Sequence, residues 1–133
     1  MLTYIDKLAF IDLKEKKILS TLSLGKSVWY IPGGKRESGE SDQEALIREV
    51  KEELSVQLIS ETITHYGTFE AQAHGKPEGT LVRMTCYTGK FSGELIAAAE
   101  VAEYRYVDYS WKEKSSAVDQ LIFDDLYAKG LIE

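Results

Sequence analysis

Apolar and polar residues alternate along several short segments of the chain, and this pattern predicts β-strands. Leu8–Leu13 and Lys17–Leu22 are expected to form two strands joined by a turn at Lys14–Lys16. Val28–Ile31 is a third, short strand that stops at Pro32, after which two glycines start a flexible loop. Three further strands are predicted, at Thr62–Ala71, Thr80–Phe91 and Tyr104–Tyr109. Ala71–Gly79 is expected to be the loop between the first two of them.

Two other segments have the apolar spacing of a helix. Ser41–Leu54 begins with the S-x-x-E pattern of a capping box, formed by Ser41 and Glu44. Its apolar stripe consists of Leu46, Ile47, Val50 and Leu54. Ala117–Lys129 is expected to close the chain as a second helix, with a buried side made of Val118, Leu121, Ile122, Asp125 and Leu126. Strands interspersed with helices in this order predict an α/β protein, with helices on both faces of a sheet in an α/β/α sandwich.

Length and charge narrow the possible functions. The 133 residues fit one domain, 1–133, with a real hydrophobic core. The formal net charge of −6 repels nucleic-acid phosphates, so a nucleic-acid polymer is not an expected partner. A small phosphate-bearing ligand remains compatible with this charge if a metal ion supplies local positive charge.

The cellular location is expected to be the cytoplasm. Cys86 is the only cysteine, so no internal disulfide can form, which fits a reducing compartment. The segment Met1–Phe10 lacks the basic and apolar regions of a signal peptide, and no apolar stretch reaches membrane-spanning length. We therefore expect no membrane association.

Three carboxylates lie close together on the first predicted helix. Glu49 is three residues before Glu52 and four before Glu53, and side chains at these spacings are neighbours on a helix. Like charges at such positions destabilise a helix by roughly 0.2–0.5 kcal/mol per pair. A solvated acidic face would explain the cluster, but a hard divalent cation would turn the repulsion into coordination.

The surrounding residues resemble the Nudix box. Gly34 is followed at the family's spacing by Glu40, then by Arg48, Glu49, Val50, Glu52 and Glu53, and finally by Val56. The one departure is Ser55, which stands where the family usually has a helix-ending glycine. The segment Trp29–Gly34 is also similar to the usual lead-in. The resemblance implies the Nudix fold, an α/β/α sandwich with a mixed β-sheet.

The resemblance also implies a metal site and catalytic residues. Mg²⁺, or alternatively Mn²⁺, would be bound by Glu49, Glu52 and Glu53, with the backbone carbonyl of Gly33 as a further ligand. Arg48 would orient Glu52, four residues later. A last ligand is expected before the late strand, from Glu100 in preference to Glu103. The base that accepts a proton from water could be Glu52, Glu53 or one of these two later glutamates.

Candidate substrate-binding residues lie outside the acidic cluster. Arg83 on a strand face is a candidate for phosphate or ribose, Tyr30 for stacking on a base, and Lys35 in the glycine loop for phosphate. His74 is in a loop that could overhang the site, although an isolated loop histidine is more often a bystander. Cys86 alternates with Val82 and Met84 and is expected to be a buried thiol.

The predicted function is Mg²⁺-dependent hydrolysis of a pyrophosphate bond in a nucleoside diphosphate derivative. A nucleoside triphosphate or related small nucleotide is the first substrate candidate, and ADP-ribose or a nucleotide sugar is the alternative. A Nudix-fold sensor that binds a nucleotide without cutting it would be expected to lack the intact acidic residues. An isoprenoid diphosphate isomerase would need a catalytic cysteine that Cys86 does not resemble. Both a monomer and a homodimer are compatible with the sequence.

Overall fold

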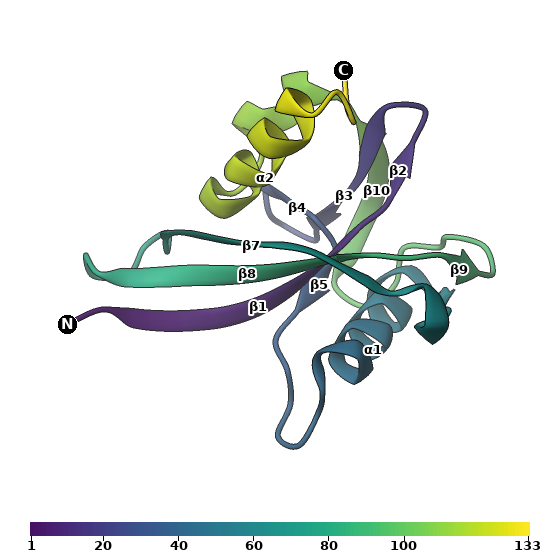
Figure 1. Ribbon diagram of the computed structural model, residues 1–133, viewed down its shortest axis with the longest axis horizontal. Coiled ribbons are helices and arrows are strands. Elements are labelled where there is room, and N and C mark those ends of the chain that lie inside the picture. The colour runs from purple at the N-terminus through teal and green to yellow at the C-terminus, as the bar shows by residue number, and fades with distance from the viewer.

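The computed structural model describes residues 1–133 and contains two helices packed on opposite sides of a sheet of long strands (Figure 1). The strands are β1 (Thr3–Ile11), β2 (Leu13–Lys14), β3 (Lys17–Ser23), β4 (Trp29–Tyr30), β5 (Gly33–Gly34), β6 (Gln57–Leu58), β7 (Thr64–Gln72), β8 (Thr80–Thr88), β9 (Phe91–Ser92) and β10 (Val101–Val107). The helices are α1 (Asp42–Leu54) and α2 (Ala117–Ala128), with short 3-10 helices at Ser60–Thr62 and Tyr109–Lys114.

The main sheet is mixed. Its strand order is β5-β1-β8-β7, in which β1 and β8 are parallel and the other neighbours are antiparallel. A second sheet has the order β10-β3-β2, with β4 also paired to β3, and β6 pairs with β9. The mixed sheet implied by the family resemblance is therefore confirmed.

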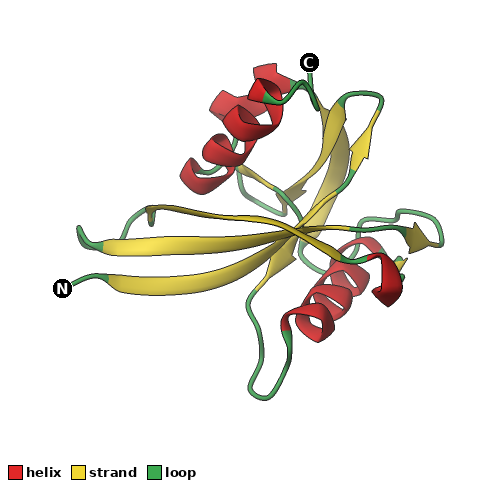
Figure 2. Ribbon diagram, in the orientation of Figure 1, coloured by secondary structure: helices red, strands yellow, loops and turns green.

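The side chains of β1 point alternately to the two faces of the main sheet, and each face is covered by one helix. Leu8 and Phe10 are buried in the cluster that includes α1, whereas Ala9 and Ile11 are buried in the cluster that includes α2. Successive side chains on a strand point to opposite faces, so four consecutive apolar residues feed two separate cores. Figure 2 shows the resulting layers, helix, sheet and helix. The predicted α/β/α sandwich is confirmed.

Several strand boundaries differ from the sequence-based predictions. β1 begins at Thr3 and not at Leu8, because Thr3 to Lys7 pair with β8 through the backbone while Tyr4 and Asp6 stay exposed. β10 begins at Val101, three residues earlier than expected, and ends at Val107. Backbone pairing extends these strands beyond the segments in which the side chains alternate clearly.

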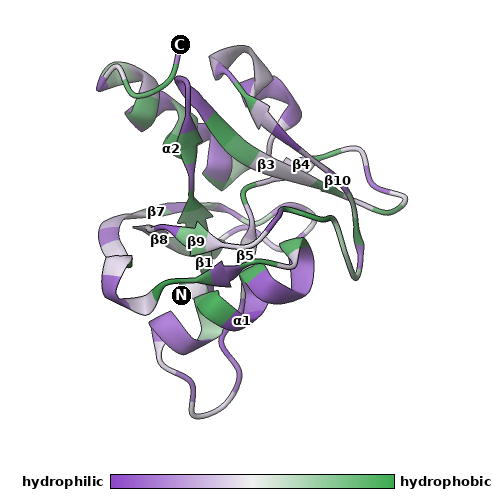
Figure 3. Ribbon diagram, turned by 90° about the vertical axis from the view of Figure 1, so that its right-hand side faces the viewer, coloured by the Kyte–Doolittle hydropathy of each residue, from purple (hydrophilic) through white to green (hydrophobic).

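Helix α1 starts as predicted. The Ser41 side chain accepts from the Glu44 backbone N–H, and the Glu44 carboxylate accepts from the Ser41 N–H, which completes the capping box. Figure 3 shows the hydrophobic side of α1 against the sheet and its hydrophilic side outward. At the other end Ser55 adopts φ 65°, the left-handed conformation that glycine would adopt more easily. The Ser55 hydroxyl donates to the Ile96 carbonyl at 3.0 Å, which helps to hold this exit.

The buried side of α2 differs from the prediction at two positions. Leu121 is 40% exposed, whereas Asp119 is completely buried beside Val118 and Ile122. One Asp119 carboxylate oxygen accepts from the Ile31 backbone N–H at 2.9 Å, and the side chain of Ser116 also interacts with this carboxylate. This contact ties α2 to the segment directly before the Gly33–Gly34 strand.

Replacing Asp119 with Asn is expected to change how stability depends on pH. Burial raises the pKa of the Asp119 carboxyl from 3.8 to about 7, so in this range the folded state binds the proton more tightly than the unfolded state. The stabilising contribution of Asp119 is therefore complete below about pH 4 and is lost as the pH rises through about 7. The wild type should lose stability relative to Asp119→Asn between about pH 5 and pH 8.

Urea unfolding of both proteins at the two pH values measures this difference. Asp108→Asn is the matched control, because hydrogen bonds from Ser110 lower the pKa of Asp108 and its effect should be the same at both pH values. A pH-independent difference between wild type and Asp119→Asn would contradict the prediction.

Candidate active site

Arg48 is the centre of the polar network that shapes the loop before α1. Its guanidinium donates to both carboxylate oxygens of Glu40, at 2.8 and 2.9 Å, and to Glu49 at 2.8 Å. It also donates to the Lys35 backbone carbonyl at 3.0 Å. The Arg48 hydrogen bonds lower the pKa of the Glu40 carboxyl to about 2. Arg48 therefore joins the glycine loop, Glu40 and the first of the three helix carboxylates.

Two glycines let the β5 backbone approach both β1 and α1. A Cβ atom on Gly33, which has φ 148°, would lie 2.0 Å from the Leu8 carbonyl oxygen. A Cβ atom on Gly34 would lie 2.5 Å from a carboxylate oxygen of Glu49. The contact at Gly33 is with backbone atoms, so glycine is required there, whereas a side chain at position 34 would displace the Glu49 carboxylate. The glycines thereby bring a backbone strand directly against the acidic face of the helix.

Glu53 lies at this junction in a strongly acidic environment. Its carboxylate accepts from the Gly33 N–H at 3.1 Å. Burial raises the pKa of Glu53 well above 4.5, and the nearby carboxylates of Glu49 and Glu100 raise it further. This repulsion between three negative groups is what a bound divalent cation would remove.

The three helix carboxylates do not all converge as expected. Glu49 and Glu53 face the glycine strand, whereas Glu52 has a side chain that is 54% exposed and a 3.5 Å contact to Arg48. No group of three or more acidic, histidine or cysteine side chains is arranged for metal binding. The expected single patch is thus corrected: helical geometry puts Glu49 and Glu53, four residues apart, on the inner side and Glu52 at its solvent edge.

Glu100 and Glu103 occupy different environments. Glu100 lines a pocket of about 170 Å³ together with Gly33, Gly34 and Glu53. Glu103 instead forms an ion pair with Arg105 at 3.1 Å on β10. Of the two candidates from the sequence, Glu100 is the one that lies beside the helix carboxylates.

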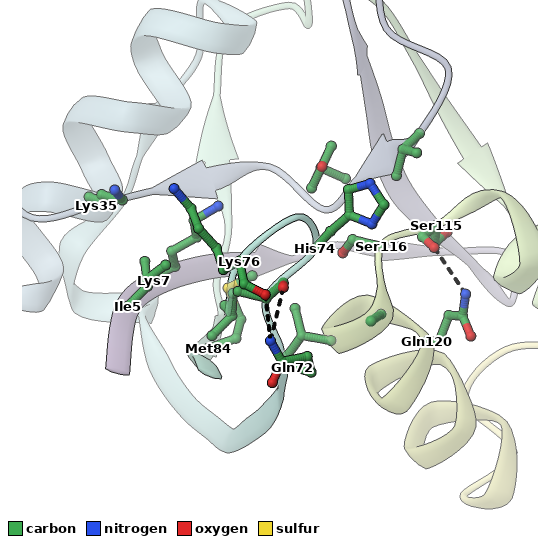
Figure 4. A pocket seen from close by; sticks show the side chains of 16 residues that line it. Ile5, Lys7, Lys35, Gln72, His74, Lys76, Met84, Ser115, Ser116 and Gln120 are labelled. Atoms are coloured by element: carbon green, nitrogen blue, oxygen red, sulfur yellow. Dashed lines mark hydrogen bonds between the residues drawn. The ribbon is translucent and has the colours of Figure 1, made fainter. Parts of the chain in front are cut away.

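A larger pocket of about 460 Å³ adjoins this acidic pocket. Lys7, Tyr30 and Met84 line both of them. Lys35 and His74 line the larger one, which runs along the sheet to the start of α2 (Figure 4). Its volume is that of a small-molecule site, and about half of its lining residues are hydrophobic. Tyr30 and Lys35 are therefore placed where a substrate could reach them.

Arg83 is not placed there. It lies on the opposite face of the sheet, where it forms an ion pair with Glu70 at 2.8 Å and covers the ring of Tyr4. The alternation of β8 turns Val82 and Met84 toward the pocket and Arg83 away from it. Arg83 therefore lines neither pocket, and its role in binding substrate stays an untested prediction.

Other predictions are resolved by burial and position. Cys86 is fully buried as expected, and burial raises the pKa of its thiol. Lys7 and Lys76 were not among the predicted site residues, yet both line the larger pocket. Lys7 could have been identified from the sequence, because strand alternation places it between Ile5 and Ala9 on an otherwise apolar face of β1. Lys76 lies in the loop between β7 and β8, and the periodicity of side chains does not predict where a loop residue lies in the folded protein.

Comparison with known proteins identifies the arrangement. The model of the NUDIX domain matches residues 10–121. The chain belongs to the Nudix family. A curated relative is the uncharacterized Nudix hydrolase YvcI of Bacillus subtilis (strain 168), which is 25% identical over 108 residues, covering 80% of this chain and 68% of YvcI. This chain is thus a Nudix-type pyrophosphohydrolase, and the resemblance found in the Gly34–Val56 segment is confirmed.

Two solved structures have the same fold as this chain. The MutT protein of Methanosarcina mazei Go1 superposes with a TM-score of 0.77 and 21% identity, covering 97% of this chain and 96% of that protein. The ORF135 protein of E. coli superposes with a TM-score of 0.74 and 22% identity, covering 96% and 91% of the two chains. No helix of the present chain combines the length and apolar character needed to cross a membrane.

The residues present suit the divalent ion that Nudix hydrolases use. Glu49, Glu53 and Glu100 carry hard oxygen donors, although the three side chains are not gathered into a ready metal site in this structure. The repulsion of Glu53 by Glu49 and Glu100 marks the place where a positive charge is favoured. The close approach of Gly34 to Glu49 leaves the backbone of the glycine strand next to these donors. Carboxylates and backbone carbonyls are the ligands expected for Mg²⁺ and Mn²⁺, in contrast to softer metals.

Proposed function

We propose that this protein hydrolyses the pyrophosphate bond of a nucleoside diphosphate derivative with bound Mg²⁺, for which Mn²⁺ can substitute. The observation that carries this proposal is the direct connection of an acidic pocket to a larger, partly apolar pocket through Lys7, Tyr30 and Met84. A diphosphate held in the first pocket places the rest of the nucleotide in the second. Nucleoside triphosphates are the first substrate candidates, and ADP-ribose and nucleotide sugars are the second.

The metal ligands in this proposal are Glu49, Glu52, Glu53, Glu100 and the Gly33 carbonyl. A bound ion would neutralise charge on the leaving phosphate and acidify the attacking water. Glu53 is held in place by the Gly33 N–H. Glu52 lies at the solvent edge with a 3.5 Å contact to Arg48 and would have to turn inward to reach a bound ion. Glu52 and Glu53 are the proposed catalytic carboxylates.

The substrate-binding residues in the proposal are Tyr30 and Lys35. Arg48 has an indirect role, because it positions other residues of the site. Arg48 holds Glu49 and the Lys35 backbone, so it positions both the metal site and the glycine loop. The Tyr30 ring is partly exposed in the wall shared by both pockets, where a nucleobase or ribose can pack on it.

A substrate screen tests the proposal. The purified protein is incubated with nucleoside triphosphates, ADP-ribose, nucleotide sugars and dinucleoside polyphosphates, and released phosphate, pyrophosphate or nucleoside monophosphate is measured. We expect hydrolysis of at least one diphosphate-containing nucleotide with Mg²⁺ or Mn²⁺ and loss of that activity with EDTA. Absence of turnover of every compound with either ion would contradict the proposal.

A further inference from the structure

The larger pocket has an unusual distribution of charge for this protein. The chain contains 22 acidic residues against 16 lysines and arginines. None of the 16 residues that line the larger pocket is acidic, whereas Lys7, Lys35, Lys76 and His74 are among them. A strongly acidic molecule has thus collected basic groups around one cavity, which creates a local positive field for an anion.

The three lysines of this pocket have no carboxylate partner. None of them lies within 4.0 Å of an Asp or Glu oxygen, although Lys112 and Lys129 elsewhere form ion pairs at 2.8 and 3.0 Å. The buried Asp119 carboxylate accepts from the Ile31 N–H, and the charge of Lys7 acts on it from beyond ion-pair distance. The ammonium groups of Lys7, Lys35 and Lys76 are therefore available to a bound ligand.

The opposite end of the pocket is also suited to an anion. Ser116 is the N-cap of the 12-residue helix α2, and it makes no side-chain capping hydrogen bond. Ser116 lines the pocket, and its side chain also interacts with the buried carboxylate of Asp119 in the first turn of α2. Figure 4 shows His74 between the three lysines and the Ser116 end. Free N–H groups and the dipole of a helix N-terminus add to the positive field of the lysines.

We infer that the larger pocket binds a phosphate monoester of the substrate. This inference rests on the proposed function and specifies its substrate class: nucleoside diphosphate derivatives that carry one more phosphate, on the group that enters the larger pocket. In the proposed function, the acidic pocket would hold the scissile diphosphate together with a bound metal ion. A neutral base or sugar in the second pocket would leave the three ammonium groups without a ligand of opposite charge.

Two matched substrate pairs test the inference, because the members of each pair differ by one phosphate monoester. They are ADP-ribose with its 2′-phosphate, and 3′-dephospho-coenzyme A with coenzyme A. For each compound kcat/KM is measured with Mg²⁺, and Kd is measured by calorimetry in EDTA, where no turnover occurs. We expect the phosphorylated member of at least one pair to have a kcat/KM at least tenfold higher and a correspondingly lower Kd.

Variants connect this preference to the pocket. Lys7→Gln combined with Lys76→Gln should reduce the preference to about twofold or less. Lys90→Gln is the control, because Lys90 is an exposed lysine outside both pockets and should keep the full preference. The inference is overturned if neither pair shows a preference in Kd or kcat/KM, or if the preference persists in the double variant.

The two readouts separate this inference from the proposed function. Tighter binding of a phosphorylated member, lost in the double variant, with no hydrolysis of any nucleotide would support the phosphate site and contradict the hydrolase proposal. Hydrolysis with equal Kd and equal kcat/KM for the two members of both pairs would support the hydrolase proposal and contradict the phosphate site. Absence of both binding preference and turnover would contradict both.

Discussion

Glu53→Gln is expected to reduce kcat by about 10²–10⁴-fold, the range for loss of a catalytic acid–base group or an essential metal ligand. The amide oxygen of Gln can still accept from the Gly33 N–H, so the backbone arrangement at the glycine strand should persist. What is lost is the negative charge that faces Glu49 and Glu100. The measurement is steady-state hydrolysis with Mg²⁺, of whichever nucleotide the screen identifies.

The same variant should not be less stable than the wild type when metal is absent. The folded-state pKa of Glu53 is raised, so this carboxylate opposes folding increasingly as the pH rises above 4.5. A neutral side chain removes this cost, and in EDTA the melting temperature at pH 7.5 should be equal or higher. Added Mg²⁺ should raise the melting temperature of the wild type more than that of Glu53→Gln, because the ion stabilises the folded state to which it binds.

Glu103→Gln is the matched control for this experiment. Glu103 lies on β10, pairs with Arg105 and does not line the acidic pocket, so its removal should leave kcat and the Mg²⁺ effect unchanged. Full activity of Glu53→Gln, or an equal loss in Glu103→Gln, would show that the proposed role of Glu53 is wrong.

Arg48→Lys is expected to lower kcat/KM by about 10–100-fold, the usual effect of removing a group that orients metal ligands. The guanidinium of Arg48 simultaneously reaches both oxygens of Glu40, one oxygen of Glu49 and the Lys35 carbonyl. A lysine keeps the positive charge but has a single nitrogen, which cannot span these partners. The Glu40 carboxylate, with its pKa of about 2, would lose its two-point contact.

The loss in Arg48→Lys should come with weaker metal binding. The concentration of Mg²⁺ that gives half-maximal activity should rise, because Glu49 is no longer held toward the glycine strand. Arg36→Lys is the control in the same loop, since Arg36 pairs with Asp42 and contacts neither Glu40 nor Glu49. An unchanged Mg²⁺ requirement in Arg48→Lys would contradict the positioning role.

Local sequence patterns were sufficient for much of the fold. The capping box at Ser41 and Glu44 starts α1 at the expected place, because its two hydrogen bonds join residues only three apart. The alternating apolar residues of β1 and β8 identified strands, although not their full length. The order of elements and the spacing from Gly34 to Val56 were enough to indicate the Nudix fold, which the family match confirms.

Acidic residues at helical spacing after a glycine loop were enough to recognise the Nudix family, because they lie within one stretch of chain. Which groups meet around that stretch depends on the folded arrangement. Pairing of β1 with β8 and the packing of α2 place Lys7, Lys76 and Ser116 around one pocket, while strand alternation turns Arg83 to the other face. The physical reason is that helical spacing is a local property, whereas register and packing join residues far apart in the chain.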